Sequence, residues 1–399
     1  MDGPLPPAVV LGIDTPIGLA IVRDLGMRGV PVHGIAWSAR AIGLASRYLH
    51  RGLIRAEGEA ALIQQLIDLR QALGQTCLFA IAESDIALLN RHRDRLAGYH
   101  LMFADAARMA RVLDKKQTYA AAARAGLHVP QTRQVRSMTQ AESASRELRF
   151  PVVLKWANPH EVMRRLSDAG LPLEKTHYCN TPGELLGYLR PYEAVGLYPL
   201  VQEYCAGYGL GQFILMKDRQ AHYLFQHQRV HEWPPEGGFS SLCVSLGLDR
   251  HHELMGQSVA LLRELDWEGI AMVEYRHDPA TGRSALMEIN GRFWGSLPLA
   301  WHAGASFPWL AYELFGMGRT PAPAPYRAGV RCRFMAPETK RLLRVLFQQH
   351  RIADRSVSFK RLPTFIGYLL DFVRPGTRYF VFVWRDPAPF LKDVSRILR

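Results

Sequence analysis

A hairpin late in the chain constrains the fold more than any other feature of the sequence. Two apolar runs, 270–275 and 284–290, are separated by Asp278-Pro-Ala-Thr-Gly282, which is typical turn chemistry. If the turn is centred near residue 281, Glu274 and Glu288 lie at equal distances from that centre. We therefore expect an antiparallel pair of strands in which these two carboxylates face each other.

The same two strands carry oxygen donors suited to a metal ion. Alternate side chains of a strand share a face, so Asn290 and Arg292 are expected beside Glu288. Opposed carboxylates repel, and a divalent cation would remove that repulsion. Two carboxylates and an amide oxygen suit Mg²⁺, or Mn²⁺ in its place. The pattern predicts Glu274, Glu288 and Asn290 as metal ligands and Arg292 as a partner of an anion. The alternative, a solvated sheet edge, is disfavoured by the apolar neighbours of Glu288.

The first hundred residues alternate between short apolar runs and helical patterns. A strand at 8–12, a turn over 12–18, a helix ending near Gly29 and a strand at 30–37 are typical of a doubly wound parallel sheet. The turn glycines do not form G-x-G-x-x-G, so we interpret them as a tight turn rather than a dinucleotide site.

Two lysines stand in settings that could serve phosphate binding. A helix is expected over 106–125, and it contains Lys115. Strands are expected at 150–156, which carries Lys155, and at 198–204. Two converging ammonium groups would suit a nucleotide, although each lysine taken alone is more often a solvated surface residue.

The net charge of +13 belongs mostly to the last part of the chain. Residues 331–399 hold fifteen Lys and Arg against five Asp and Glu, which leaves the rest of the 399 residues nearly balanced. Helical patterns at 338–349 and 363–373 and an apolar run at 379–384 interleave with these cations. Contact with an anionic membrane and packing onto the body are both open, and we favour packing. No nucleic-acid partner is expected, because no binding fold accompanies the charge.

Cysteine usage and hydropathy predict a cytoplasmic protein, with contact at the inner face of the membrane left open. The five cysteines are scattered without paired spacing, which favours reduced thiols. The N-terminus lacks a basic region followed by an apolar one, and no stretch approaches the ~20 apolar residues that span a bilayer.

Five segments in order resemble motifs of the ATP-grasp superfamily, of the carboxylate–amine ligase type. The segments are Leu113-Asp-Lys115, Phe150-Pro-Val-Val-Leu-Lys155, Val201-Gln-Glu-Tyr204, Met272-Val-Glu-Tyr275 and Met287-Glu-Ile-Asn-Gly-Arg292.

The resemblance implies a mixed α/β and α+β architecture in four parts. An N-terminal doubly wound domain would occupy 1–108, and a two-lobed ATP-grasp domain 109–319, with lobes at 109–200 and 201–319. A Pro/Ala linker at 320–326 and a basic, mostly helical extension at 327–399 would follow.

The resemblance also implies roles for individual residues. Lys115 and Lys155 would contact the phosphates of ATP. Arg292, with Arg229, would stabilise charge on the acyl group. The hinge strand beside adenine would be formed by Gln202, Glu203, Tyr204 and Cys205, and the Mg²⁺ ligands would be Glu274, Glu288 and Asn290.

Two departures from the family pattern concern the nucleotide. No glycine-rich loop follows Lys155, and we expect the cations Arg164, Arg165 and Lys175 to substitute for its amides. Beyond the hinge, 207–211 offers no acidic or polar residue for the ribose.

The segment 228–241 contains Pro-Pro-Glu-Gly-Gly and resembles a loop of ATP-grasp carboligases related to D-aspartate ligases, which implies a position near the acceptor. An anion-binding loop and an ordinary turn explain its residues equally well. We expect His227 and His231 beside it to be ordinary polar residues rather than metal ligands.

The expected activity is ATP-dependent joining of a carboxylate to an amine through an acyl phosphate, with release of ADP and phosphate. Both substrates would be small molecules or peptides. The alternatives are an ATP-grasp kinase or carboxylase on another acceptor, and a non-catalytic nucleotide-binding protein at a membrane surface.

Overall fold

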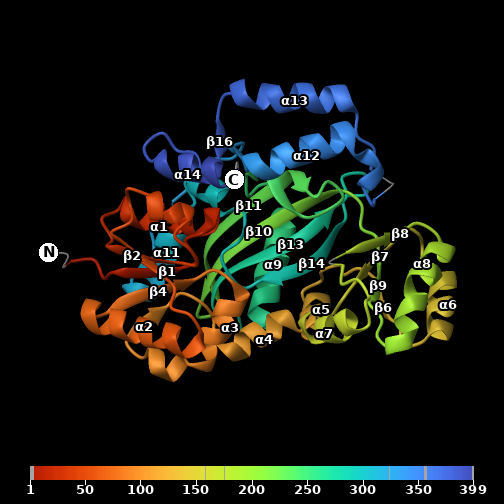
Figure 1. Cartoon of the computed structure of the whole chain (residues 1–399), viewed down its shortest axis with the longest axis horizontal. Helices are drawn as coiled ribbons and strands as arrows, with labels where there is room; N and C mark the ends of the chain where they lie inside the picture. The colour runs from red at the N-terminus through yellow and green to blue at the C-terminus, as the bar shows by residue number, and fades with distance from the viewer. Residues whose placement is uncertain (1–3, 158, 175, 323, 355–356, 398–399) are drawn as a thin grey trace.

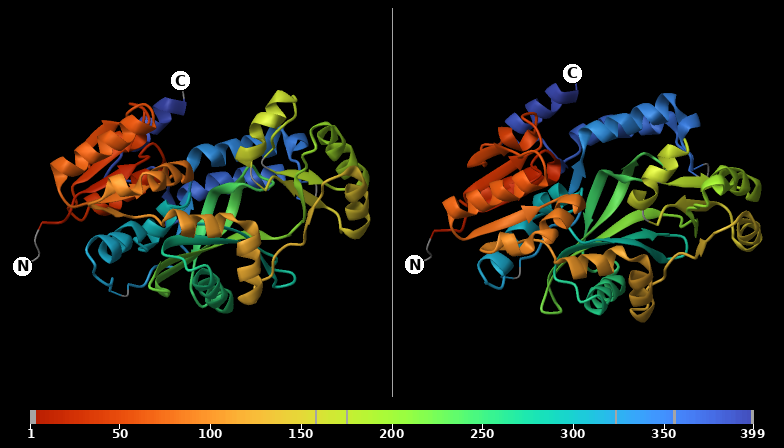
Figure 2. Two further views of the ribbon diagram at one scale, coloured as in Figure 1. Left: turned by 90° about the horizontal axis from the view of Figure 1, so that it is seen from below. Right: turned by 60° about the horizontal axis from the view of Figure 1, so that its bottom comes forward.

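The computed structural model describes residues 4–157, 159–174, 176–322, 324–354 and 357–397. Three sheets organise the chain: a five-stranded sheet at one end, a four-stranded sheet at the other and a seven-stranded sheet between them (Figures 1 and 2).

The N-terminal domain is a parallel sheet covered on both faces, as predicted. Alternate residues of its first strand enter two separate cores: Val10 packs with Leu19 of α1, and Val9 packs with Leu62 of α2. A side chain at Gly18 would overlap the Gly12 carbonyl, so glycine there permits the tight strand-to-helix turn. The strand order is β3 (Arg51–Ile54), β2 (Val32–Ala36), β1 (Ala8–Leu11), β4 (Thr76–Ala80) and β5 (Tyr99–Leu101), and the helices are α1 (Pro16–Gly26), α2 (Glu59–Leu73) and α3 (Glu83–Arg91).

The predicted helix over 106–125 is two helices. Asp114 ends α4 (Ala106–Leu113) and caps α5 (Lys115–Arg124), because its carboxylate accepts the backbone N–H of Lys116 at 2.8 Å. The break places Lys115 at the first position of a helix instead of its middle.

The four-stranded sheet is antiparallel and small. Its strands run in the order β6 (Thr132–Gln134), β9 (Leu200–Glu203), β7 (Val152–Lys155) and β8 (His177–Cys179), with helices α6 (Met138–Glu147), α7 (Pro159–Asp168) and α8 (Pro182–Leu189). Residues of α6 and α8 form a core with β7. Strand β9 therefore belongs to the first lobe, beyond the boundary at 200 that the sequence suggested.

The seven-stranded sheet contains the hairpin from which the prediction started. Glu274 pairs with Glu288 in the observed register, as the turn chemistry predicts. Helix α9 (His252–Glu264) packs on one face, and α10 (Leu297–Ala303) and α11 (Phe307–Ala311) on the other. A π-helical turn at 312–316 follows α11. The strand order is β14 (Ser284–Asn290), β13 (Gly269–His277), β10 (Tyr208–Lys217), β11 (Gln220–Trp233), β12 (Phe239–Leu246), β15 (Arg331–Arg333) and β16 (Thr377–Tyr379).

The basic C-terminal part is built into this body. Strands β15 and β16 complete the large sheet, and α12 (Met335–Phe347) lies on β11 and β12. Helix α14 (Ala388–Ile397) returns to the N-terminal domain, while α13 (Arg361–Val373) forms an outer layer over α12 (Figure 1). The preferred interpretation, packing on the body, is thus confirmed for most of the extension. Pro323 of the expected linker lies outside the described residues.

Within the described part of the chain, no helix combines the length and hydropathy that a membrane span requires.

Candidate functional site

Two lysines and two glutamates converge between the four-stranded and seven-stranded sheets. Lys155 is the last residue of β7, and Lys115 opens α5. Burial lowers the pKa of Lys155, and the charges of Glu288 and Glu274 oppose that shift. Burial and the charge of Lys155 lower the pKa of Lys115, against the attraction of Glu288. Four predicted site residues, from helix α5 and from both sheets, therefore lie close enough for their charges to act on one another.

The predicted metal ligands lie together but already have protein partners. The side chain of Glu274 is 14% exposed and Glu288 is exposed. Asn290 donates from Nδ2 to Oε1 of Glu288 at 3.0 Å. The Oδ1 atom of Asn290 accepts from Nη2 of Arg292 at 3.0 Å, so the amide oxygen faces the arginine. Among the described residues, no group of three or more His, Cys, Asp or Glu is placed to hold a metal ion. Two opposed carboxylates still fit Mg²⁺, which takes its remaining ligands from water and phosphate.

Arg229 supplies the cation that the opposed carboxylates need. Its Nη2 lies 2.5 Å from Oε2 of Glu274, and its Nη1 lies 3.4 Å from Oε1 of Glu232. Burial raises the pKa of Glu274. The positive charge of Arg229 lowers this pKa, and the negative charge of Glu288 raises it further. Arg229 thus has internal partners, and its contact with a substrate anion stays a prediction.

The Pro-Pro-Glu-Gly-Gly segment forms the turn between β11 and β12, at 234–238. Arg229 donates to the carbonyl oxygen of Gly238 at 2.9 Å, and Oη of Tyr178 donates to that of Glu236 at 2.7 Å. The turn is therefore held by residues of both sheets and lies against the charged cluster. His227 is buried farther along β11, against Phe213, and His231 bonds to Glu338 of α12 at 2.6 Å.

Arg292 has an acidic partner that the sequence analysis missed. Its Nε lies 2.9 Å from Oε1 of Glu83, at the N-terminus of α3. Glu83 follows β4, and the carboxyl ends of parallel strands are where open α/β sheets bind ligands. The place of Glu83, directly after a parallel strand, could therefore have identified it as a site residue from the sequence. The pair joins the N-terminal domain to the charged cluster.

Residues 235–337 match the family described as ATP-grasp in the biosynthetic pathway with Ter operon. No curated protein sequence matches the chain.

Solved structures match over most of the chain at low identity. The L-amino acid ligase from Bacillus licheniformis aligns with 15% identity and a TM-score of 0.57, covering 79% of this chain and 75% of that one. N5-carboxyaminoimidazole synthetase from Staphylococcus aureus aligns with 14% identity and a TM-score of 0.60, covering 86% of both. Biotin carboxylase from Campylobacter jejuni, in an ATP-analogue complex, aligns with 12% identity and a TM-score of 0.61, covering 81% of this chain and 74% of that one. The chain has the ATP-grasp fold.

The ATP-grasp hinge predicted at 202–205 lies where β9 leaves the four-stranded sheet for β10. Gln202 is buried and donates to Thr132 at 3.0 Å, and Glu203 accepts the backbone N–H of Gln131 at 3.1 Å. Tyr204 donates to Asp354 of the C-terminal part at 2.8 Å, and the thiol of Cys205 lies 3.9 Å from the Glu203 carbonyl. The side chains of the segment thus fix the hinge, and contact with adenine stays a prediction.

The cations expected to replace an ATP-grasp glycine-rich loop are only partly placed. Arg165 donates to the carbonyl oxygen of Val195 at 2.9 Å, and Arg164 lies 4.0 Å from Asp168 on the same helix. Lys175 lies outside the described residues. Coverage of phosphate by these side chains stays a prediction.

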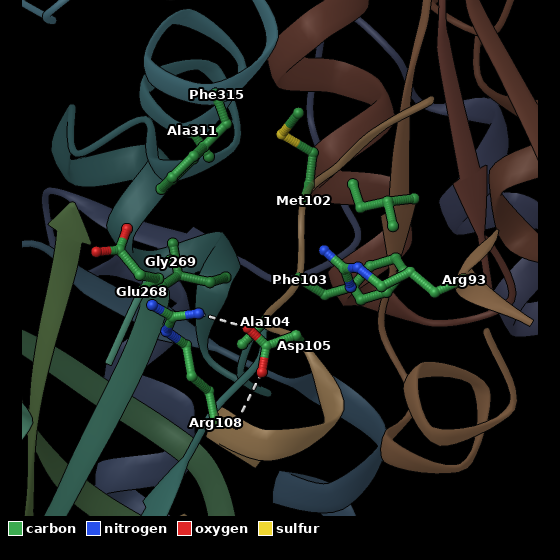
Figure 3. Close-up of a pocket in the computed structure, with 12 residues that line it drawn as sticks. Arg93, Met102, Phe103, Ala104, Asp105, Arg108, Glu268, Gly269, Ala311 and Phe315 are labelled. Atoms are coloured by element: carbon green, nitrogen blue, oxygen red, sulfur yellow. Dashed lines mark hydrogen bonds and ion pairs between the residues drawn. The ribbon is translucent and has the colours of Figure 1, made fainter. Parts of the chain in front are cut away.

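A separate cavity of about 150 Å³ lies between the N-terminal domain and the first residues of β13, at the end of that strand away from Glu274 (Figure 3). It is lined by Arg108, Glu268 and Phe315 among others, and Arg108 bonds there to Asp105. None of the predicted site residues lines it.

Proposed function

We propose that this ATP-grasp protein is a ligase that joins a carboxylate to an amine and releases ADP and phosphate. The observation that carries the proposal is the convergence of two half-buried lysines, Lys115 at the start of α5 and Lys155 at the end of β7, on the opposed pair Glu274 and Glu288. Half-buried lysines beside carboxylates are arranged for a polyanion and a cation bound together, which is how proteins hold a nucleotide phosphate. The fold shared with the Bacillus ligase supports the same conclusion.

The reaction would proceed in two steps. A substrate carboxylate oxygen attacks the γ-phosphorus of ATP, a new O–P bond forms, and the bond to the β-phosphate oxygen breaks. The amine then attacks the acyl carbon, the C–O bond to phosphate breaks, and the amine loses a proton. No cysteine or serine nucleophile is required.

The residues of the chain would act by position and charge. Lys115 and Lys155 would neutralise phosphate oxygens, and Arg292, oriented by Glu83, would face the acyl oxygen. Mg²⁺ held by Glu274 and Glu288 would neutralise charge on the transferred phosphate. Arg229 would keep Glu274 in place and would retain its ion pairs with Glu274 and Glu232 during the reaction.

The test is release of ADP and phosphate by the full chain, incubated with ATP and a mixed pool of amino acids and other carboxylates. Arg292→Ala is expected to bind ATP nearly as well as the wild type and to lose at least about tenfold in phosphate release. Arg283→Ala, at the exposed turn of the same hairpin, is the matched control and should retain activity. Turnover by Arg292→Ala at the wild-type rate would contradict the assignment.

The role of Glu288 as a metal ligand is tested by the Mg²⁺ dependence of nucleotide binding. Glu288→Gln removes one of two carboxylates and is expected to raise the Mg²⁺ concentration needed for nucleotide binding. An unchanged Mg²⁺ titration would contradict a role of Glu288 as a ligand.

A carboxylase is the second candidate, favoured by the similarity to biotin carboxylase. Bicarbonate would then replace the organic carboxylate as the phosphorylated group. Phosphate release that requires bicarbonate, and no other carboxylate, would select this alternative.

A further inference from the structure

Helix α13 presents a continuous apolar face that no other element of the described chain covers. It lies outside α12, at the upper margin of the molecule in Figure 1. Six large apolar side chains are 41–77% exposed at the spacing of one helix face. These six, which we call the α13 stripe, are Leu362, Phe365, Ile366, Leu369, Leu370 and Val373.

The opposite face of α13 is fixed to the body. Tyr368 hydrogen bonds to Thr339 of α12 at 2.7 Å, and its ring lies 4.0 Å from the guanidinium carbon of Arg333. The buried Asp371 pairs with Arg331 of β15 at 3.2 Å. Because these contacts anchor the inner face, the stripe cannot turn inward without breaking them.

The charges around α13 have one sign at the surface. All five acidic residues of the C-terminal part are buried, at 7% exposure or less: Glu338, Asp354, Asp371, Asp386 and Asp393. Cations remain exposed next to the stripe, with Lys360 and Arg361 before it and Arg374 and Arg378 after it. The exposed charges of the C-terminal part next to the stripe are therefore all positive, and one of them, Arg374, also lies 3.4 Å from the buried Asp371.

We propose that α13 binds an anionic lipid bilayer, lying parallel to the surface with its stripe among the acyl chains. An apolar helix face bordered by Lys and Arg is the arrangement that interfacial helices use, and anionic headgroups are the partners of those cations. At thirteen residues the helix is too short to span the membrane, so it would lie in the interface.

Charge argues against a second copy of this chain as the occupant. An antiparallel pairing of two α13 helices would place Arg361 of one copy near Arg374 of the other. A parallel pairing would bring identical cations together at both ends. Either arrangement would bring like charges close without any exposed carboxylate in the C-terminal part to offset them.

The experiment is flotation of the full-length protein with vesicles of phosphatidylcholine, with and without phosphatidylglycerol, at low and high salt. The wild type is expected to float with anionic vesicles at low salt and to be released at high salt, because exposed charges are screened. Ile366→Ser with Leu369→Ser should weaken binding by at least about tenfold, because two apolar side chains that would be buried among the acyl chains are lost. Lys360→Gln with Arg361→Gln should weaken binding at low salt as well.

Matched controls keep the proposal falsifiable. Ile54→Ser changes an isoleucine of similar exposure in β3 of the N-terminal domain and should leave flotation unchanged. Circular dichroism melting establishes that each variant is folded. Unchanged flotation of the stripe variant, or equal binding to neutral vesicles, would overturn the proposal. So would a stripe-dependent dimer in sedimentation velocity without vesicle binding.

Phosphate release is measured in a separate experiment. Absence of phosphate release would contradict the proposed ligase function but not the binding of α13 to membranes.

Discussion

At the scale of single residues, Gly209 decides how closely Arg229 can approach Glu274. A Cβ atom at Gly209 would lie 2.6 Å from Cδ of Arg229 and 2.8 Å from Oε1 of Glu232. Both contacts are shorter than van der Waals distance, so the arginine and the glutamate would have to move. The ion pair with Glu274 therefore depends on a position that has no side chain.

Gly209→Ala is expected to destabilise the protein by about 1–3 kcal/mol, the usual range for overpacking a filled interior. It should also weaken nucleotide binding, because displacement of Arg229 leaves Glu274 beside Glu288 without its cation. Urea unfolding and nucleotide titration measure the two effects. Gly187→Ala is the control, since a Cβ at that position in α8 meets nothing within 4 Å and alanine favours a helix. Equal effects of the two substitutions would contradict the packing argument.

At the scale of secondary-structure elements, the sequence predicted what depends on local pattern. The β13–β14 register followed from turn chemistry and counting, and the N-terminal sheet followed from its alternation of strands and helices. The split at Asp114 was accessible too, because aspartate is a preferred N-cap. Partners far apart in the sequence were not accessible: Arg292 and Glu83 are separated by 209 positions, and no periodicity reports which elements approach. The same holds for Arg229, whose partner was identified only once β11 and β13 were placed around β10.

Helix α10 and strand β16 meet at His302, whose burial predicts that the fold loses stability in acid. Burial lowers the pKa of His302 to about 4, although the Tyr379 carbonyl 3.0 Å away opposes the shift. The folded state therefore binds fewer protons than the unfolded state between pH 6.5 and about 4. The stability that the neutral ring contributes is complete above pH 6.5 and is lost as the pH falls through that window.

His302→Gln should flatten the fall in unfolding free energy between pH 6.5 and 4.5. The full contribution of the shift is about 3 kcal/mol. Urea unfolding at several pH values measures it. His252→Gln, at an exposed position of α9, should leave the slope as it is in the wild type. An unchanged slope in His302→Gln would place the acid sensitivity elsewhere.

At the scale of the whole molecule, an ion pair joins the two ends of the chain. Nε of Arg23 in α1 lies 2.9 Å from Oδ2 of Asp386, and each side chain is 1% exposed. Ser46 donates to the same carboxylate at 2.7 Å, and the backbone N–H of Arg47 donates at 2.9 Å. The C-terminal part is therefore a component of the N-terminal domain's core.

Asp386→Asn is expected to cost about 3–5 kcal/mol, because it leaves the Arg23 guanidinium buried without a counter-ion. Arg23→Met combined with Asp386→Leu should recover most of that loss. Asp168→Asn, which breaks an exposed pair with Arg164, should cost less than about 1 kcal/mol. Urea unfolding compares the variants. A cost for Asp386→Asn as small as for Asp168→Asn would show that the buried pair does not support the fold.

The separation of Arg23 and Asp386 by 363 positions also has a consequence for synthesis on the ribosome. The N-terminal domain emerges from the ribosome well before Asp386, yet the buried Arg23 of that domain has its partner there. At about 5–20 residues per second, that interval is roughly 20–70 seconds. During it the nascent domain exposes the surface that α14 later covers. A chain truncated before Asp386 lacks the counter-ion of Arg23, so we expect its N-terminal domain to be less stable and more susceptible to proteolysis.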